Sequence, residues 1–258
     1  MQIKYTNSSF ENFKNSDLFN KKIIDTISTF SPLNIVLNEK LLQETIQTVK
    51  NFELRKKKII LFGTGGSNLG ARALHNINNH KKIEIEFYDN IDPITFEKSF
   101  NNIDFKTTGF IIISKSGSTP ETLAQFSSLY QIAFETSNTD LFLSNTLIIT
   151  EFKKSPLYDI AKENNCLILE HNKEIGGRFS VFSNVGIVPA ILSGINISKL
   201  YSGALEIIKN IEKYSALNIG KYLCLNEKKQ FSSSVIMTYS DNFYFFGKWY
   251  MQLWAESI

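Results

Sequence analysis

The sequence contains few cysteines and prolines and no long apolar run. Its two cysteines are too few for a disulfide framework. Cys166 and Cys224 are also too far apart in sequence for a Cys-x-x-Cys motif. With 5 prolines and 13 glycines in 258 residues, the chain is neither a collagen nor a linker protein. The apolar runs, such as residues 110–113 and 147–149, are much shorter than the roughly 18 residues of a membrane helix. We therefore expect no membrane partner.

The chain also lacks a strong charge of either sign. It has 28 basic and 25 acidic residues, a formal net charge of +3, which gives no indication of nucleic-acid binding. The lysine-rich segments 55–58, 81–82 and 228–229 each precede an apolar run and are interpreted as solvated strand entrances. The first residues form no apolar signal segment, so we expect a cytoplasmic protein. A hydrophobic content of 43% predicts a well-formed core.

Short apolar runs alternate with helical patterns along most of the chain. Strands are predicted at residues 58–62, 83–88, 109–114, 146–150 and 167–169, and helices at residues 67–77, 95–100 and 120–137. Such alternation indicates βαβ units, and hence an α/β fold with a parallel sheet and helices on both faces. Ligands of these sheets bind beyond the carboxyl ends of the strands, where the loops lie.

The last third of the chain follows a different pattern. Residues 197–214 are helical without strands and are expected to bridge two lobes. A strand at residues 234–239 and a helix at residues 241–257 then predict the beginning of a second α/β lobe.

Two loops rich in glycine and hydroxyl groups follow predicted strands. The first, residues 63–70, fits neither the Rossmann fingerprint, because Asn68 replaces its last glycine, nor the Walker A motif, because Ala71 replaces its lysine. Glu84 and Glu86 lie near the distance of a ribose-binding acid, so a dinucleotide site stays open, as does a simple tight turn.

The second loop, residues 114–122, reads Ser-Lys-Ser-Gly-Ser-Thr-Pro-Glu-Thr and opens a helix. Ser118 and Glu121 fit a capping box, but capping leaves the other hydroxyls and Lys115 unexplained. Hydroxyls, an amine and the N–H groups of a helix start are suited to binding a phosphomonoester. A third loop, residues 175–180, places Arg178 after two glycines, either at the same crevice or on the surface.

Several motifs together resemble the phosphoglucose isomerase family, and they occur in that family's order. They are Gly65-Gly66-Ser67, residues 90–93, 114–122 and 176–180, and the closing stretches 237–241 and 249–257. The resemblance covers residues 45–258. The most specific parts are Gly-Gly-Arg-Phe-Ser and Gln-Leu-Trp-Ala-Glu-Ser. The loop 114–122 alone is shared by many sugar-isomerase (SIS) phosphosugar domains.

The resemblance implies interconversion of glucose 6-phosphate and fructose 6-phosphate through a cis-enediol. It implies Glu256 as the base and Arg178 as the charge that stabilises the enediolate. The implied phosphate- and sugar-binding residues are Gly66, Ser67, Ser114, Lys115, Ser116, Thr119, Glu121 and Thr122, with Lys115 and Glu121 on the sugar side. Such a reaction needs a carboxylate base and a nearby positive charge, and the resemblance implies neither a metal nor a cofactor.

The resemblance also implies a domain division and a partner. Residues 1–44 would be a helical extension, residues 45–195 a first SIS-type domain, and residues 196–258 a helical bridge with the start of a second, incomplete SIS-type domain. The family is typically dimeric, so a homodimer of the full-length protein is expected.

The sequence departs from the family pattern at several points. The family motif continues beyond Glu-Ser, and no motif for its ring-opening histidine or late lysine is found, so the chain is expected to be an N-terminal portion of an isomerase. His75, His80 and His171 match no family motif and have no zinc-ligand spacing. Ser116 replaces a threonine that is more usual in the family and keeps the hydroxyl.

Two alternatives stay open at this stage. A non-catalytic phosphosugar-binding module would keep the loops at Ser67 and Ser114 but needs neither Arg178 nor Glu256. An amidotransferase-type sugar isomerase domain would call for a glutaminase domain, and none precedes residue 45.

Overall fold

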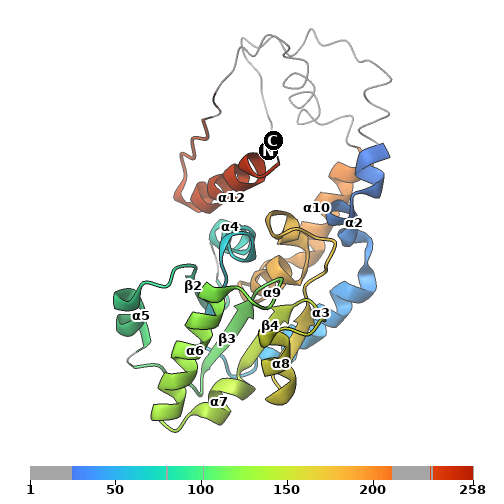
Figure 1. Cartoon of the computed structure of the whole chain (residues 1–258). Helices are drawn as coiled ribbons and strands as arrows, with labels where there is room; N and C mark the ends of the chain where they lie inside the picture. Colours follow the sequence, from blue (N-terminus) through green and yellow to red (C-terminus); the bar gives the residue numbers. More distant parts are fainter. Residues whose placement is uncertain (1–24, 80, 101, 211–232, 234, 258) are drawn as a thin grey trace.

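The chain forms a single five-stranded parallel sheet with helices on both faces (Figure 1). The computed structural model describes residues 25–79, 81–100, 102–210, 233 and 235–257. The strands are β1 (Lys58–Phe62), β2 (Glu84–Tyr88), β3 (Thr108–Ile113), β4 (Thr146–Thr150) and β5 (Leu167–Glu170). They are ordered β2-β1-β3-β4-β5, and every neighbouring pair is parallel. The α/β fold and all five predicted strands are confirmed.

The central strands are apolar because both of their faces are covered. Every residue of β3 and β4 is buried, and so is β1 after Lys58. The edge strands are less covered: Glu84 on β2 and Leu167 on β5 are exposed. A parallel sheet with continuous apolar strands at its centre is typical of this layered arrangement.

Four helices cover one face of the sheet. They are α5 (Pro93–Phe100), α6 (Pro120–Glu135), α7 (Thr139–Ser144) and α8 (Pro156–Glu163). Alternate strand residues such as Ile60, Phe110 and Ile148 pack here against Phe126 and Phe142. Because side chains alternate across a strand, their neighbours in sequence point to the other face.

The opposite face is covered by α3 (Glu39–Phe52) and α9 (Asn184–Leu192), with α4 (Leu69–Ile77) packed beside α9. Ile59, Ile111 and Leu147 contribute to this second core. Helix α9 is buried almost throughout, as a helix without a polar face must be, and it was not predicted from the sequence.

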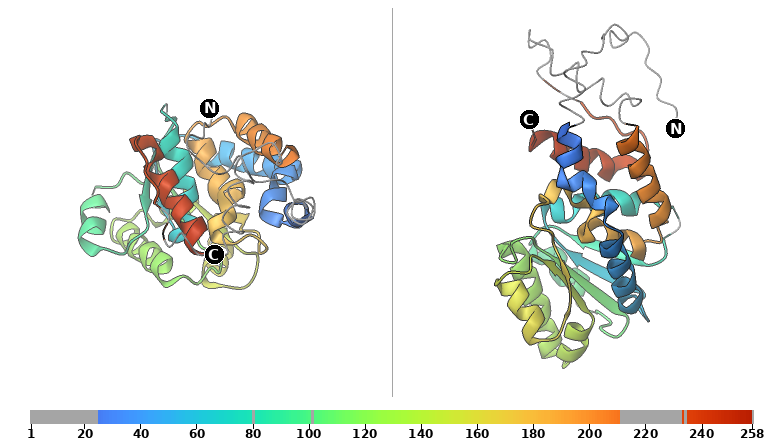
Figure 2. Two further views of the ribbon diagram at one scale, coloured as in Figure 1. Left: turned by 90° about the horizontal axis from the view of Figure 1, so that it is seen from above. Right: turned by 90° about the vertical axis from the view of Figure 1, so that its right-hand side faces the viewer.

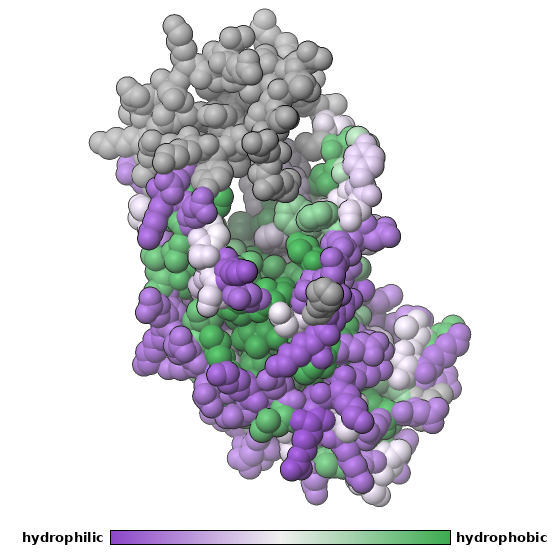
Figure 3. All heavy atoms as spheres, turned by 180° about the vertical axis from the view of Figure 1, so that it is seen from behind, coloured by the Kyte–Doolittle hydropathy of each residue, from purple (hydrophilic) through white to green (hydrophobic). Residues whose placement is uncertain are grey.

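A smaller core joins the remaining helices to α9. It includes residues of the turn η2 (Ile35–Leu37), which follows α2 (Ser31–Asn34), and of α10 (Ile197–Lys209). Figure 2 shows α10 beside α9, and Figure 3 shows apolar side chains gathered on the back face near the grey segments. The predicted helix at residues 197–214 is confirmed as far as Lys209, and residues 211–214 lie outside the described part of the chain.

The prediction of a strand at residues 234–239 is wrong for the residues that the structure describes. Residues 235–239 have no regular structure, and Val235, Met237 and Tyr239 are largely exposed. A strand is stable only when its backbone N–H and C=O groups are paired, and no described strand lies beside this segment to pair with it. Residue 234 lies outside the described residues.

The final helix is present and lies beside α4 (Figure 2). It consists of a turn, η6 (Asp241–Phe243), followed by α12 (Tyr244–Ala255). The guanidinium of Arg72 on α4 lies 4.2 Å from the ring centre of Phe245, and an ion pair to Asp89 at 3.0 Å holds it in place. Several aromatic side chains of η6 and α12 remain exposed, including Phe243, Phe246 and Tyr250. None of the described helices is both long and apolar enough to cross a membrane.

A buried histidine on α4, in contact with the C-terminal end of α9, makes the fold sensitive to acid. The Nδ1 atom of His75 lies 2.7 Å from the Ser193 hydroxyl, and the residue is 5% exposed. Burial, with smaller contributions from the charges of Lys81 and Arg72, lowers the pKa of His75 from 6.5 to about 4. Between these two values the unfolded chain binds the proton and the folded chain does not, so the free energy of unfolding falls as the pH falls through this window.

We expect His75→Asn, whose amide can occupy the place of Nδ1, to reduce this acid sensitivity. Urea unfolding at about pH 7 and about pH 5 should show a larger loss of stability in the wild-type protein than in the variant. Equal losses in both proteins would contradict the role given to His75.

Candidate functional site

The candidate site is a cavity of about 440 Å³ at the carboxyl ends of β1, β3 and β4. It is lined by Thr64, Gly66, Ser67, Lys115, Ser116, Thr119, Glu151, Lys153 and Gly177. These residues come from four loops that are distant in sequence. In a parallel sheet the carboxyl ends of all strands meet at one edge, which is why the loops converge.

The loop after β1 approaches the arginine loop at backbone distance. Gly66 lies in the turn η3 (Gly65–Ser67), and a Cβ atom there would stand 2.2 Å from the carbonyl carbon of Gly177. The Ser180 hydroxyl donates to the carbonyl oxygen of Gly66 at 3.2 Å. Only glycine permits this approach. The helix predicted to begin at residue 67 begins at Leu69. The side-chain amide of Asn68, the residue before it, donates to the Gly63 carbonyl at 3.1 Å.

The loop after β3 is held by hydrogen bonds among its own hydroxyls. Ser114 Oγ lies 2.7 Å from Thr119 Oγ1 and accepts from the Gly117 N–H at 3.2 Å. Ser116 Oγ accepts from the N–H of Ser118 at 3.2 Å and lies 3.1 Å from its hydroxyl. Ser114 is buried, whereas the hydroxyls of Ser116 and Thr119 line the cavity beside the N-terminus of α6.

The predicted capping box of Ser118 and Glu121 is not formed. The N-cap residue of α6 is Thr119, and no side chain caps the helix. The Ser118 hydroxyl turns to Ser116 instead, because Gly117 reverses the backbone with φ at +69°. The uncapped N–H groups of α6 therefore remain available to an anion.

Three of the predicted binding residues do not line the cavity: Ser114, which is buried in its loop, and Glu121 and Thr122 on α6. Glu121 is exposed on the first turn of α6, and Thr122 is fully buried behind it with no hydrogen-bond partner for its hydroxyl. Lys115 lines the cavity, but its Nζ donates to the carbonyl oxygens of Lys173 at 2.7 Å and Ile175 at 3.1 Å. In this state Lys115 ties the loop after β3 to the loop that carries Arg178.

Arg178 and Glu256 lie together although they are far apart in sequence. Arg178 Nη1 is 3.4 Å from Glu256 Oε2, and Arg178 Nε donates to the Ser257 hydroxyl at 3.0 Å. Trp249 Nε1 donates to the Arg178 carbonyl at 2.9 Å, which fixes α12 to the turn η4 (Gly177–Phe182). Gln252 Nε2 donates to Glu256 Oε1 at 2.9 Å. Gln252 was not singled out from the sequence, although it lies one helical turn before Glu256.

This ion pair adjoins the cavity. Arg178 directly follows Gly177, which lines the cavity. The Gln252 amide nitrogen lies 3.5 Å from the Cβ position of Gly65, on the other side of the same contact. The hydroxyls that could bind an anion therefore lie on one side of Gly65–Gly66, and the Arg178–Glu256 pair lies next to them.

Glu151 and Lys153 were missed by the sequence analysis. Both line the cavity, and Lys153 Nζ lies 2.7 Å from Glu151 Oε2. The hydrogen bond from Lys153 is the largest cause that lowers the pKa of the Glu151 carboxyl below its usual value. Their position directly after a buried strand could have identified them, by the rule that singled out the other loops.

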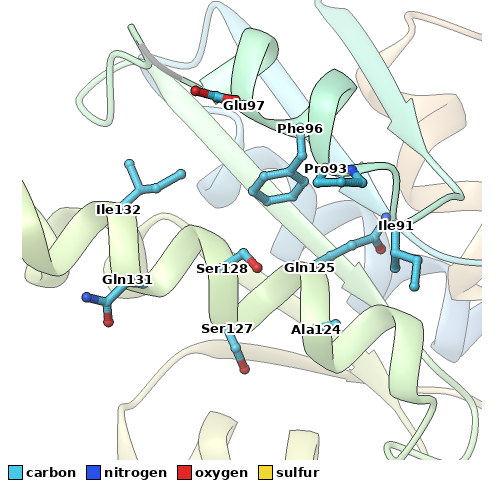
Figure 4. A pocket seen from close by; sticks show the side chains of 10 residues that line it. All are labelled: Ile91, Pro93, Phe96, Glu97, Ala124, Gln125, Ser127, Ser128, Gln131 and Ile132. Atoms are coloured by element: carbon cyan, nitrogen blue, oxygen red, sulfur yellow. The ribbon is translucent and has the colours of Figure 1, made fainter.

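A larger hollow of about 800 Å³ lies elsewhere, between α5 and α6 (Figure 4). Its lining is mainly apolar, with Phe96 and Ile132 on opposite sides, and its one charged residue is Glu97. The amide of Gln125 is turned to the carbonyl oxygens of Tyr88 and Asn90. A negative charge and no cation make this hollow unsuitable for a phosphate. The described residues contain no cluster of His, Cys, Asp or Glu that could hold a metal ion.

Comparisons with known proteins identify one family. A family model described as phosphoglucose isomerase matches residues 39–257. A probable glucose-6-phosphate isomerase of Methanococcus maripaludis is 33% identical, and the match covers 100% of this chain and 64% of that protein. The glucose-6-phosphate isomerase of Campylobacter jejuni is 32% identical, with 98% of this chain and 60% of that protein covered.

A solved structure supports the fold. A hypothetical protein of Thermus thermophilus superposes with a TM-score of 0.83 at 24% identity, over 94% of this chain and 59% of that one. The chain thus spans about two thirds or less of the length of these similar proteins. The family match extends from α3 to the end of α12 and includes every loop that lines the cavity. The chain therefore belongs to the phosphoglucose isomerase family.

Proposed function

We propose that the protein to which this chain belongs interconverts glucose 6-phosphate and fructose 6-phosphate. The observation that carries the proposal is the pairing of Arg178 with Glu256 at 3.4 Å, beside a cavity lined by Ser67, Ser116 and Thr119. Hydroxyls and helix N–H groups suit the phosphate, and the charged pair suits chemistry at the other end of the sugar. A module that only binds phosphosugars needs no such pair.

The proposed mechanism uses groups of this chain. The phosphate binds to Gly66, Ser67, Ser116 and Thr119, with Ser114 and Thr122 supporting their loop. Lys115 lies on the sugar side, whereas Glu121, which is exposed outside the cavity, contacts no substrate in this mechanism. Glu256 removes the proton from the carbon next to the carbonyl, and the negative charge that develops on the oxygen is stabilised by Arg178. The hydroxyl proton on the first carbon passes to the former carbonyl oxygen, and Glu256, now protonated, returns its proton to the former carbonyl carbon. Gln252 orients the carboxylate through its 2.9 Å hydrogen bond.

The proposal is tested by assaying the full-length gene product with fructose 6-phosphate. We expect formation of glucose 6-phosphate, detected by a coupled reduction of a nicotinamide cofactor, at a kcat in the ordinary range of about 1–1,000 per second. A protein that binds fructose 6-phosphate without converting it would favour the non-catalytic module and contradict the proposal.

We also propose the following organisation. Residues 1–44 form an extension, residues 45–195 a first SIS-type domain, and residues 196–258 a bridge with the start of a second SIS-type domain. Support for the last part comes from the exposed aromatic side chains of α12, which a second lobe would cover. A cytoplasmic homodimer is the proposed form of the full-length protein, in keeping with the family resemblance.

A further inference from the structure

The loop that follows β4 places a second lysine at the candidate site. Glu151 and Lys153 line the cavity together with Lys115, Ser116 and Thr119. The phosphate-binding groups proposed above come from the loops after β1 and β3 and do not include this third loop. The contacts of the two lysines differ, and the difference indicates which of them can bind a ligand.

Lys115 has two of its three donors occupied by backbone carbonyls. Its ammonium group has three N–H bonds; two go to the carbonyl oxygens of Lys173 and Ile175, and Glu151 Oε1 lies 3.9 Å away. Its side chain is 34% exposed. Removing Lys115 from these contacts would leave two backbone carbonyls without their partner, which makes exchange to a ligand unfavourable.

Lys153 is held by a single side-chain partner. Its Nζ lies 2.7 Å from Glu151 Oε2, and its side chain is 58% exposed. Its backbone N–H donates to the Glu151 carbonyl at 2.8 Å, and this tight turn keeps the backbone of Lys153 beside the cavity. Glu151 is only 14% exposed, but Lys115 remains 3.9 Å from it, so Lys153 can leave this pair for a stronger acceptor without removing every cation from the carboxylate.

The charges that line the cavity also favour Lys153 as the lysine that binds a ligand. Its lining has two cations and one anion, and Glu151 contacts both cations. A phosphomonoester carries nearly two negative charges at neutral pH and accepts short, charge-assisted hydrogen bonds. The hydroxyls of Ser116 and Thr119 are neutral, so a lysine is needed to balance that charge.

We propose that Lys153 is a phosphate-binding residue that leaves Glu151 and pairs with the phosphate of the ligand. This inference rests on the proposed function in taking a sugar phosphate as the ligand. Glu151 then acts as a counter-charge that holds Lys153 near the cavity when no phosphate is bound. Because the phosphate does not take part in the reaction, this contact contributes equally to binding of the substrate and of the transition state.

The test uses the full-length protein, with inorganic phosphate as the probe in calorimetry. We expect Lys153→Met to weaken phosphate binding about tenfold, the effect of losing one charge-assisted hydrogen bond in a partly exposed site. In turnover assays the KM for fructose 6-phosphate should rise by a similar factor with kcat nearly unchanged. The matched control is Lys154→Met, which removes the adjacent exposed lysine outside the cavity lining. It should leave both values unchanged at constant ionic strength.

A second variant should change the affinity for inorganic phosphate in the opposite direction. Glu151→Gln removes the anion that competes for Lys153, so we expect inorganic phosphate to bind several-fold more tightly than in the wild-type protein. Unchanged binding in Lys153→Met, an equal loss in Lys154→Met, or weaker binding in Glu151→Gln would each overturn the inference. Calorimetry does not require turnover. If the wild-type protein binds phosphate but converts no sugar phosphate, the proposed function fails while the role of Lys153 is still tested.

Discussion

Replacing Glu256 by glutamine is expected to lower kcat for isomerisation by about 1,000-fold, within the range that a positioned general base contributes. Glutamine has nearly the same shape, and its carbonyl oxygen can still accept from Gln252 Nε2, which now lies 2.9 Å from the carboxylate. The amide has no basic electron pair, so it cannot remove a proton from carbon. The KM for fructose 6-phosphate should change far less, because the phosphate loops remain intact.

The matched control is Glu163→Gln at the exposed end of α8, which should retain wild-type kcat. Both variants are assayed as full-length proteins under saturating fructose 6-phosphate. A Glu256→Gln enzyme within about threefold of the wild-type kcat would remove Glu256 from the role of base.

Gly66→Ala is expected to damage both stability and activity. The added Cβ would stand 2.2 Å from the Gly177 carbonyl carbon and 2.6 Å from the Arg178 nitrogen, and both atoms belong to the backbone. The two loops must therefore separate, which moves Arg178 away from Glu256. We expect a loss of about 2 kcal/mol in the free energy of unfolding. We also expect kcat/KM to fall about 100-fold, the effect of misplacing a catalytic group by about 1 Å.

Gly203→Ala on α10 is the matched control, because no atom lies within 4 Å of the added Cβ. There alanine should raise the free energy of unfolding by up to about 1 kcal/mol through its better helix propensity. Urea unfolding and steady-state kinetics measure both variants. A Gly66→Ala protein as stable and as active as Gly203→Ala would show that the two loops do not need their close approach.

The sheet could be predicted from sequence because its strands are continuous apolar runs separated by turn residues. The segment at residues 235–239 has the same apolar character, yet it forms no strand. What differs is the neighbour: β1 pairs on both sides, whereas this segment has no described strand beside it. Local composition reports the propensity to form a strand and says nothing about whether a partner is present.

The candidate site, too, could be predicted from the sequence only in part. The loops after β1 and β3 could be predicted to meet because parallel strands place their carboxyl ends together. The roles of Arg178 and Glu256 came only from the family resemblance, and their contact could not be derived from spacing. That contact depends on how α12 lies beside α4 and on the hydrogen bond from Trp249 to the Arg178 carbonyl. Such packing between distant segments leaves no periodic signal in the sequence.

The proposed function requires a carboxylate of this chain to transfer a proton between neighbouring carbons of a sugar phosphate. The most direct test is to convert fructose 6-phosphate in D₂O with the full-length protein and to examine the product by NMR. Proton transfer through Glu256 predicts glucose 6-phosphate with deuterium at C2 in at least part of the product, because the protonated base exchanges with solvent. Glucose 6-phosphate wholly free of deuterium at C2 would indicate a direct hydride shift and would contradict this account.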